Sequence, residues 1–148
     1  AKSKPLPKES YDFILTARSV HGWMGSPGMV EKTFKEFHDA LKPGGILAVE
    51  QHRANPGPQD PAAKSGYVTE AYVIEQAEKA GFKLAAKSEI NANPKDTKDH
   101  PFGVWTLPPA LRSTAYGSQT DKDPNFDHSK YEAIGESDRM TLKFVKAN

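Results

Sequence analysis

The chain has 148 residues, of which 36% are hydrophobic and 26% are charged, and its net charge is +1 at pH 7. This size fits one domain with a modest core, and the interspersed charges form no basic surface for nucleic acid. Cysteine is absent, which excludes disulfides and thiolate metal sites, and no apolar run approaches the ~20 residues that span a bilayer. We therefore expect a soluble protein that binds neither nucleic acid nor membrane. A cytoplasmic location is favoured over a periplasmic one, although a removed leader peptide is not excluded.

Residues 1–10 are rich in lysine and proline, and we expect them to be extended. An apolar strand over residues 12–18 follows, and its continuous run indicates burial on both faces. Ser26 and Pro27 predict the N-cap and the first position of a helix. One face of this helix carries apolar residues at helical spacing, namely Val30, Phe34, Phe37 and Leu41.

The helix stops before Pro43, and Gly44 and Gly45 permit a tight turn into a second apolar strand over residues 46–52. A strand, a helix and a second strand in this order form a βαβ unit. Such a unit predicts a parallel sheet with a ligand crevice at the carboxyl ends of its strands.

A Pro/Gly-rich loop leads to a second helix, which is expected to begin at the N-cap Thr69 and to end at Gly81. Its predicted apolar residues are Ala71, Ile74, Ala77 and Ala80. Residues 82–88 predict a third strand, more polar and therefore nearer the sheet edge. Alternation of apolar and polar residues predicts a last strand through Met140, Leu142 and Phe144.

Residues 91–137 lie between these last two strands and are expected to form an irregular insertion. Loops of this length are usually functional or mobile. We treat residues 11–148, with this insertion, as one α/β domain.

Four segments resemble the class I S-adenosylmethionine-dependent methyltransferases. Asp12–Leu15 and Leu41–Leu47, with the helix between them, resemble strand 4, helix D and strand 5 of that family; Glu78–Leu84 resembles the end of helix E entering strand 6, and Ser137–Phe144 the closing strand 7. Gln51–Ala54 and residues 88–96 further resemble a bacterial group called predicted methyltransferases. The resemblance implies the C-terminal half of a Rossmann-like sheet, in the order 4, 5, 7, 6 with the last strand antiparallel. It also implies S-adenosylmethionine as cofactor and a small-molecule acceptor.

The family's cofactor fingerprint, a Gly-x-Gly-x-Gly loop with an acidic residue after the next strand, has no counterpart before Tyr11. The glycines of residues 22–28 have the wrong spacing for it. We therefore expect the N-terminal half to be missing, or to be supplied by another polypeptide such as a second copy in a homodimer. The first strand then becomes an exposed edge that invites pairing.

Residues past the carboxyl ends of neighbouring parallel strands converge on one crevice. The resemblance implies that residues after the first strand contact the cofactor, and we assign this role to Thr16, Ala17, Arg18 and Ser19. His21 and His52 are the candidate catalytic bases, because histidine titrates near neutral pH. As alternatives, His21 is a loop histidine bonded to backbone, and His52 a strand-end histidine packed under the insertion.

The candidate substrate-binding residues are Trp23, Arg53, Tyr67 and Trp105. Arg53 could clamp an anionic substrate or simply pair with Glu50. Trp105 belongs to the insertion, which could close as an apolar lid, cover the sheet edge or form a subunit contact. We expect no metal site, because the spacing of His100 from its neighbouring aspartates, and of His128 from Asp127, matches no ligand motif.

Three functions remain open. The chain could be part of an enzyme that methylates a small molecule, a non-catalytic half-domain that self-associates through its strand edge, or an enzyme that uses His21 and His52 without the cofactor. Methyl transfer mainly requires alignment of the reacting atoms and exclusion of water, so the absence of a catalytic triad does not exclude it.

Overall fold

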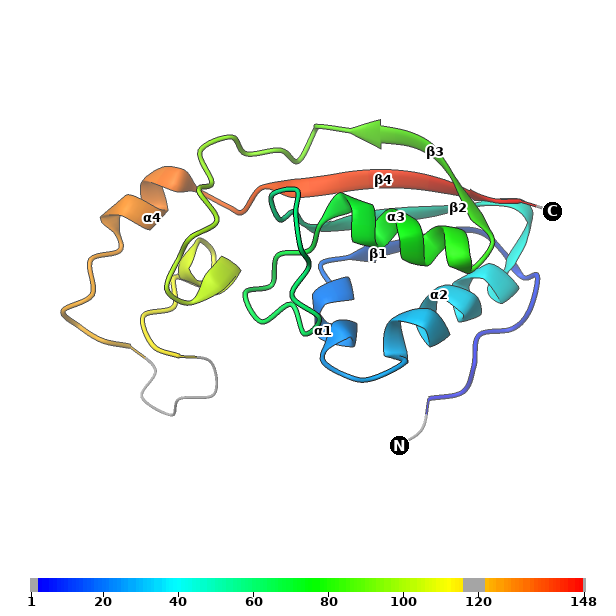
Figure 1. Cartoon of the computed structure of the whole chain (residues 1–148), viewed down its shortest axis with the longest axis horizontal. Coiled ribbons are helices and arrows are strands. Elements are labelled where there is room, and N and C mark those ends of the chain that lie inside the picture. Colours follow the sequence, from blue (N-terminus) through cyan, green and yellow to red (C-terminus); the bar gives the residue numbers. More distant parts are fainter. Residues whose placement is uncertain (1–2, 116–121, 148) are drawn as a thin grey trace.

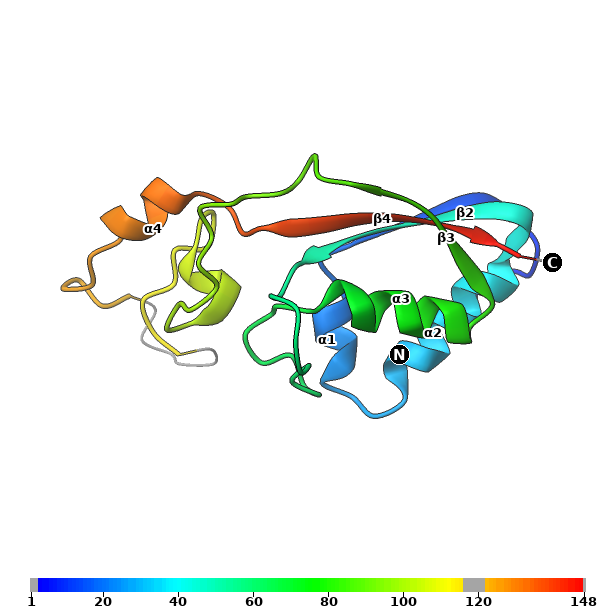
Figure 2. The ribbon, with the colours of Figure 1, turned by 45° about the horizontal axis from the view of Figure 1, so that its top comes forward.

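The computed structural model describes residues 3–115 and 122–147. Four strands form one mixed sheet in the order β1-β2-β4-β3, and the helices beside it cover a single face (Figures 1 and 2). The strands are β1 (Tyr11–Ala17), β2 (Leu41–His52), β3 (Phe82–Ser88) and β4 (Arg139–Lys146). β1 and β2 are parallel, whereas β4 is antiparallel to β2 and β3. The predicted α/β sheet with an antiparallel closing strand is confirmed.

Two helices connect β1 to β2, namely α1 (Val20–Met24) and α2 (Met29–Ala40). The predicted N-cap at Ser26 is wrong, because α2 begins only after Gly28, whose φ of +73° is left-handed. The short helix α1 occupies the chain directly after β1, so Ser26 and Pro27 lie in the turn between the two helices. Glycine permits the left-handed geometry that this turn requires.

β2 begins at Leu41, directly after α2 and five residues before the predicted start at Ile46. Its register with β1 shifts between Tyr11 and Phe13, where Leu41 and Ile46 are the successive partners. The segment around Gly44, with φ +77°, therefore forms an irregularity inside the strand. The predicted turn exists, but it is absorbed into β2.

α3 (Glu70–Lys79) has the predicted N-cap, since the Thr69 hydroxyl accepts a hydrogen bond of 3.2 Å from the backbone N–H of Tyr72. Gly81 follows the helix with φ +103°, as expected for the residue after a C-cap. The predicted apolar face is partly wrong, because Ala71 is exposed and Val73 is buried instead. Val73 and Ala77, one turn apart, face the core.

The core lies between the sheet and the helices, and its fully buried members include Phe34, Leu47, Val49, Val73 and Phe144. The alternation in β4 is confirmed, because Met140, Leu142 and Phe144 are all buried. On the opposite face of the sheet, Phe13 and Leu15 are 56% and 62% exposed, so the predicted burial of β1 on both faces is wrong for the chain as it stands. β1 also forms one edge of the sheet, as predicted, and no described segment pairs with its outer side.

The insertion follows β3 and lies at the end of the sheet where β1 and β2 finish (Figure 1). It is not wholly irregular, because it contains a 3₁₀ helix, η1 (Gly103–Thr106), and a short helix, α4 (Ser129–Ile134). Within the described parts of the chain, the helices are all too short or too polar to cross a membrane.

Candidate functional site

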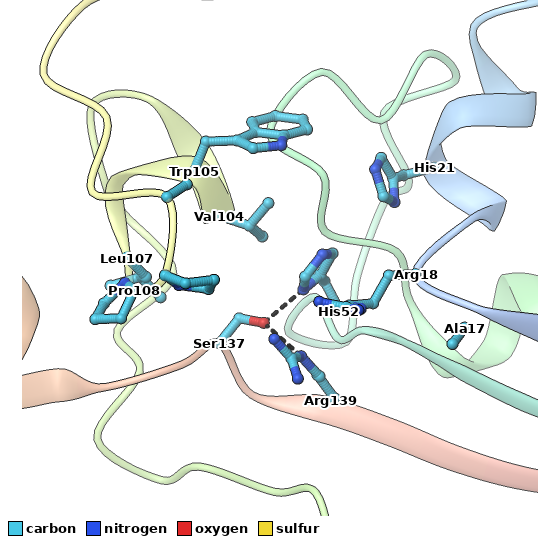
Figure 3. A pocket seen from close by; sticks show the side chains of 12 residues that line it. Ala17, Arg18, His21, His52, Val104, Trp105, Leu107, Pro108, Ser137 and Arg139 are labelled. Carbon is cyan, nitrogen blue, oxygen red and sulfur yellow. Dashed lines mark hydrogen bonds between the residues drawn. The ribbon is translucent and has the colours of Figure 1, made fainter. Parts of the chain in front are cut away.

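A cavity of about 330 Å³ lies between the carboxyl ends of β1 and β2 and the insertion (Figure 3). Ala17 ends β1, Arg18 follows it, His21 belongs to α1, and His52 comes from the end of β2. The remaining wall belongs to the start of β4 and to the insertion, with Ser137, Arg139, Val104, Trp105, Leu107, Pro108, Pro109 and Ala110. The two strand ends therefore converge, as parallel pairing requires.

His21 stands at the mouth of the cavity, and its ring centroid lies 5.4 Å from that of His52 and 5.7 Å from that of Trp105. Its Nδ1 lies 3.0 Å from the amide nitrogen of Gln51 and 3.4 Å from the amide oxygen. The shorter contact makes Nδ1 an acceptor, so the proton of the neutral ring is on Nε2. Burial lowers the pKa of His21, which favours this neutral form.

Gln51 fixes this tautomer, and sequence reasoning gave it no role. Its side-chain oxygen accepts the backbone N–H of Val20 at 3.1 Å, and its NH₂ group donates to the carbonyl of Gly66 at 3.0 Å. These two partners leave only one orientation for the amide, so the second N–H must point at His21. Gln51 is fully buried in a strand that is otherwise apolar on this face, and a buried polar residue in such a strand is the signal that could have revealed it.

His52 lies deeper in the cavity, where its Nδ1 is hydrogen-bonded to the hydroxyl of Ser137 (Figure 3). The same hydroxyl oxygen accepts the Nε–H of Arg139 at 3.2 Å. Burial, followed by the charges of His21, Arg139 and Arg18, lowers the pKa of His52 to about 3. His52 is therefore a neutral ring at physiological pH.

Ser137 and Arg139 were not among the predicted site residues. They lie beside His52 because β4 runs antiparallel to β2, which pairs Arg139 with His52. The amino end of the last strand therefore adjoins the carboxyl end of the second. The predicted antiparallel strand could have indicated these residues, had the register been known.

Arg18 follows β1 in a left-handed conformation, with φ +51°, and its backbone N–H donates to the carbonyl of Glu50 at 2.8 Å. Its side chain extends along the cavity toward His52 (Figure 3). Of the other residues predicted to bind cofactor, Ala17 lines the cavity and Thr16 is buried in β1. The Ser19 hydroxyl donates to the carbonyl of Ala17 at 3.0 Å.

Trp23 and Arg53, both predicted to bind substrate, lie outside this cavity. The Trp23 ring packs edge-on against Phe34 and Phe37, with centroids 6.3 and 5.9 Å apart, so it joins α1 to α2. All five N–H groups of Arg53 donate to carboxylates, which belong to Glu70, Glu89 and Asp138. The alternative pairing of Arg53 with Glu50 is wrong, since Glu50 lies 3.4 Å from Arg139 instead.

The Arg53 cluster is a structural anchor for the ends of the insertion. Asp138 accepts two hydrogen bonds of 2.9 Å from Arg53 and one of 2.8 Å from Lys98. Burial alone would raise the pKa of Asp138, but the hydrogen bonds from Arg53 and Lys98 outweigh it and hold the pKa well below its usual range. Lys87 also pairs with Glu70 at 3.0 Å, so the cluster contains three cations and three carboxylates and is internally balanced.

Tyr67, the third residue predicted to bind substrate, does not line the cavity and belongs to a second buried group. Its hydroxyl donates to the Asp96 carboxylate at 2.8 and 2.9 Å, and the Nε2 of His100 lies 2.7 Å from the same carboxylate. Burial and Asp96 together raise the pKa of Tyr67. This group holds the loop before α3 against the insertion, and in the described parts of the chain no three acidic or histidine side chains cluster as metal ligands would.

Trp105, the fourth, does line the cavity, because η1 is docked closely on the loop before α3. The Val104 N–H donates to the Ser65 carbonyl at 2.9 Å. A Cβ at Gly103 would lie 2.2 Å from that carbonyl oxygen, and one at Gly66 would lie 2.6 Å from the Val104 side chain. Glycine at both positions therefore allows the close approach that places Trp105 over His21.

Comparison with known proteins identifies this arrangement. Residues 1–49 match the model of a family described as "Methyltransferase domain". Among solved structures, a SAM-dependent methyltransferase from Methanosarcina mazei is similar, with TM-score 0.56 and 10% identity over 98% of this chain. The chain has the class I methyltransferase fold. The resemblance seen in the sequence is therefore confirmed for the fold.

Two other solved structures show how widely this methyltransferase fold is used. One is the 1,6-didemethyltoxoflavin-N1-methyltransferase of Burkholderia thailandensis with bound 1,6-didemethyltoxoflavin and S-adenosylhomocysteine, with TM-score 0.54 and 10% identity over 96% of this chain. The other is the 4+2 cyclase SpnF, with TM-score 0.52 and 16% identity over 98% of this chain. The chain spans 63% of the Methanosarcina protein, 46% of the Burkholderia enzyme and 53% of the cyclase. No curated protein matches the sequence.

Proposed function

We propose that the domain of which this chain forms a part transfers a methyl group from S-adenosylmethionine to a small molecule bound in the cavity between His21, His52 and Trp105. The observation that supports this function is the place of the cavity. It lies at the carboxyl ends of two adjacent parallel strands in a class I methyltransferase fold, which is where open α/β sheets bind their ligands.

The residues present fit only part of the cofactor. Residues 16–19 remain the proposed contacts, and two of them, Ala17 and Arg18, line the cavity. No carboxylate lines the cavity among the described residues, so the chain as described offers no acidic partner for ribose hydroxyls there. The missing contacts are assigned to the rest of the domain. When bound, the cofactor supplies an electrophilic methyl group on a sulfonium ion.

His21 and His52 have different roles in this proposal. His21 accepts from Gln51 at Nδ1 and therefore presents Nε2–H, which orients the acceptor by donating a hydrogen bond. The Ser137 oxygen can accept from both Arg139 and the Nδ1–H of His52, and in that tautomer the Nε2 of His52 is free to receive a proton. With a pKa of about 3, His52 is a weak base, so the site suits acceptors that lose a proton readily.

Calorimetry with S-adenosylhomocysteine tests the proposal on a protein that contains this chain together with the rest of the domain. We expect saturable binding, and its absence would refute methyl transfer. In that protein, replacement of His52 by glutamine should lower kcat by about 10²-fold for an acceptor that must lose a proton. His128→Gln is the control, because this ring packs on Phe126 in the outer part of the insertion, and the substitution should leave kcat unchanged.

The open face and edge of β1 bear on the partners of this chain. Phe13 and Leu15 are more than half exposed on the sheet face that carries no helix. In our proposal the rest of the methyltransferase domain covers this face, and a second copy of the chain is the alternative occupant. Light scattering on this chain alone distinguishes the two occupants. A dimer that Leu15→Glu disrupts is expected only if a second copy covers the face.

The His21–His52 pair also bears on an enzyme that works without the cofactor, since the rings are 5.4 Å apart. In that case, activity would persist when no S-adenosylmethionine is added and would disappear in His21→Ala and His52→Ala variants. Activity that depends strictly on added S-adenosylmethionine would exclude it.

A further inference from the structure

Arg18 is a charged side chain of the cavity that the described residues leave without an acidic partner. Arg139, the other arginine of the cavity wall, lies 3.4 Å from Glu50 and 3.4 Å from Glu136. The ion pairs and side-chain hydrogen bonds of residues 3–115 and 122–147 do not include the Arg18 guanidinium. Arg18 is exposed, and the described lining contains no aspartate or glutamate, so the lining itself does not neutralise the charge at this end of the cavity.

The backbone at Arg18 is left-handed, as it is at four other non-glycine residues in the described parts of the chain. A φ of +51° is unfavourable for any residue with a Cβ, and glycine or asparagine would adopt it more readily. Unusual backbone conformations of this kind concentrate at ligand sites, where surrounding contacts hold them. The hydrogen bond from the Arg18 N–H to Glu50 is such a contact.

The other side of the cavity is apolar, because Val104, Leu107 and Pro108 of the insertion line it. Trp105 extends this wall toward His21, whose ring it meets edge-on. The two histidines add hydrogen-bonding groups without charge, since burial lowers the pKa of both. A volume of about 330 Å³ is at the lower end for ligand sites, so the occupant is small.

We infer that the methyl acceptor is a small, largely apolar or aromatic molecule with one acidic group, which Arg18 binds while Trp105 contacts the apolar body. This inference rests on the proposed function and names the substrate class of the same cavity, but it assigns the Arg18 side chain to the acceptor and leaves the cofactor contacts to the other residues of 16–19. Guanidinium groups bind carboxylates and phosphates through paired hydrogen bonds, so either acid satisfies the chemistry. The cofactor carries a carboxylate too, and the test must separate it from the acceptor.

Intrinsic fluorescence provides a direct test on this chain, because it contains two tryptophans and Trp23 lies outside the cavity. In a Trp23→Phe background, Trp105 reports alone. The probes are benzoate, phenyl phosphate and neutral benzamide, titrated without cofactor. We expect at least one acid to quench Trp105 with an affinity ~10-fold or more above that of benzamide, since hydrogen bonds to charged groups are the stronger ones.

Arg18→Gln in this background should remove the preference for acids and leave benzamide unchanged, and Arg18→Lys should retain part of it. Lys83→Gln, on an exposed position of β3, is the matched control for loss of one positive charge and should keep the preference. Circular dichroism confirms folding of each variant. Equal affinity for benzoate, phenyl phosphate and benzamide, or no quenching by any of them, would overturn the inference.

The source of the bound acid is decided in a protein that contains the whole domain. If Arg18→Gln weakens binding of S-adenosylhomocysteine as much as binding of the acid probes, Arg18 holds the cofactor and the inference is overturned. Unchanged binding of S-adenosylhomocysteine by this variant supports it. Absence of S-adenosylhomocysteine binding by the unsubstituted protein counts against methyl transfer, whereas the acid preference is measured independently of the cofactor.

Discussion

Replacement of His52 by glutamine should make the free energy of unfolding less dependent on pH below about pH 6.5. His52 is 8% exposed, and burial together with His21 and two arginines lowers its pKa to about 3 in the folded chain. In the unfolded chain its pKa returns to about 6.5. The unfolded state therefore binds a proton first as the pH falls, and the free energy of unfolding decreases from about pH 6.5 downward until the folded pKa is reached.

The size of this effect follows from the shift. One pKa unit corresponds to about 1.4 kcal/mol, so the decrease between pH 8 and pH 5 amounts to about 2 kcal/mol. His52→Gln lacks this titration. At pH 8 its free energy of unfolding should be lower than that of the natural sequence, because the ring packing is lost. At pH 5 the difference between the two free energies of unfolding should be smaller by about 2 kcal/mol.

Urea unfolding at pH 8, 7, 6 and 5 measures both proteins under the same conditions. Ser137→Ala is the control, because it removes the hydrogen-bond partner of His52 but no titrating group. That variant should lose about 1 kcal/mol and largely keep the pH dependence. If the free energies of unfolding of His52→Gln and the natural sequence differ by the same amount at every pH, His52 is not a buried, neutral ring.

Three further substitutions test how the cavity is held together. Gly103→Ala should release η1 from the loop before α3, because its Cβ would lie 2.2 Å from the Ser65 carbonyl oxygen; faster limited proteolysis of the insertion would show the release, and unchanged cleavage would contradict the docking. Gln51→Leu should lower the free energy of unfolding by about 2–4 kcal/mol, since it leaves two buried backbone groups without their partner, and a loss under 1 kcal/mol in urea unfolding would show that water replaces the amide. Arg53→Met should lower the free energy of unfolding by about 3 kcal/mol, because the buried Asp138 loses its main cation. An unchanged free energy of unfolding would show that Lys98 alone is enough to compensate the charge of Asp138.

The βαβ unit and the last two strands could be predicted because their signals are local. Continuous apolar residues in β2 and alternation in β4 depend only on neighbouring positions, and both matched the structure. The start of α2 could not be predicted in the same way. Ser26 and Pro27 are favourable helix-starting residues, but α1 before them decides the direction from which the chain arrives, and Gly28 makes the turn.

In the candidate site, too, features that depend on local pairing could be predicted, whereas contacts between distant parts of the chain could not. Parallel pairing was enough to bring Arg18, His21 and His52 together, because it fixes which strand ends are neighbours. The partners of Arg53 and Tyr67 were hidden, since Asp138 and Asp96 are 85 and 29 residues away in the chain. No spacing rule connects such positions. Their role as substrate-binding residues stays a prediction, and in the structure both side chains are occupied within the protein.

The acidic residues in and next to the insertion have partners away from the cavity, and this leaves Arg18 as the cavity cation without an acidic partner among the described residues. Asp138 accepts hydrogen bonds from Arg53, and Asp96 accepts one from Tyr67, and neither acid lines the cavity. The apolar residues of η1 and the prolines after it line the cavity instead. Asp138 and Asp96 are thus paired within the protein, and Glu50 lies 3.4 Å from Arg139. Arg18 is itself exposed, so water and salt screen its charge, and its attraction for an acidic ligand should weaken as the salt concentration rises. The polarity of the cavity therefore arises from where the fold places Asp96, Asp138 and Glu50.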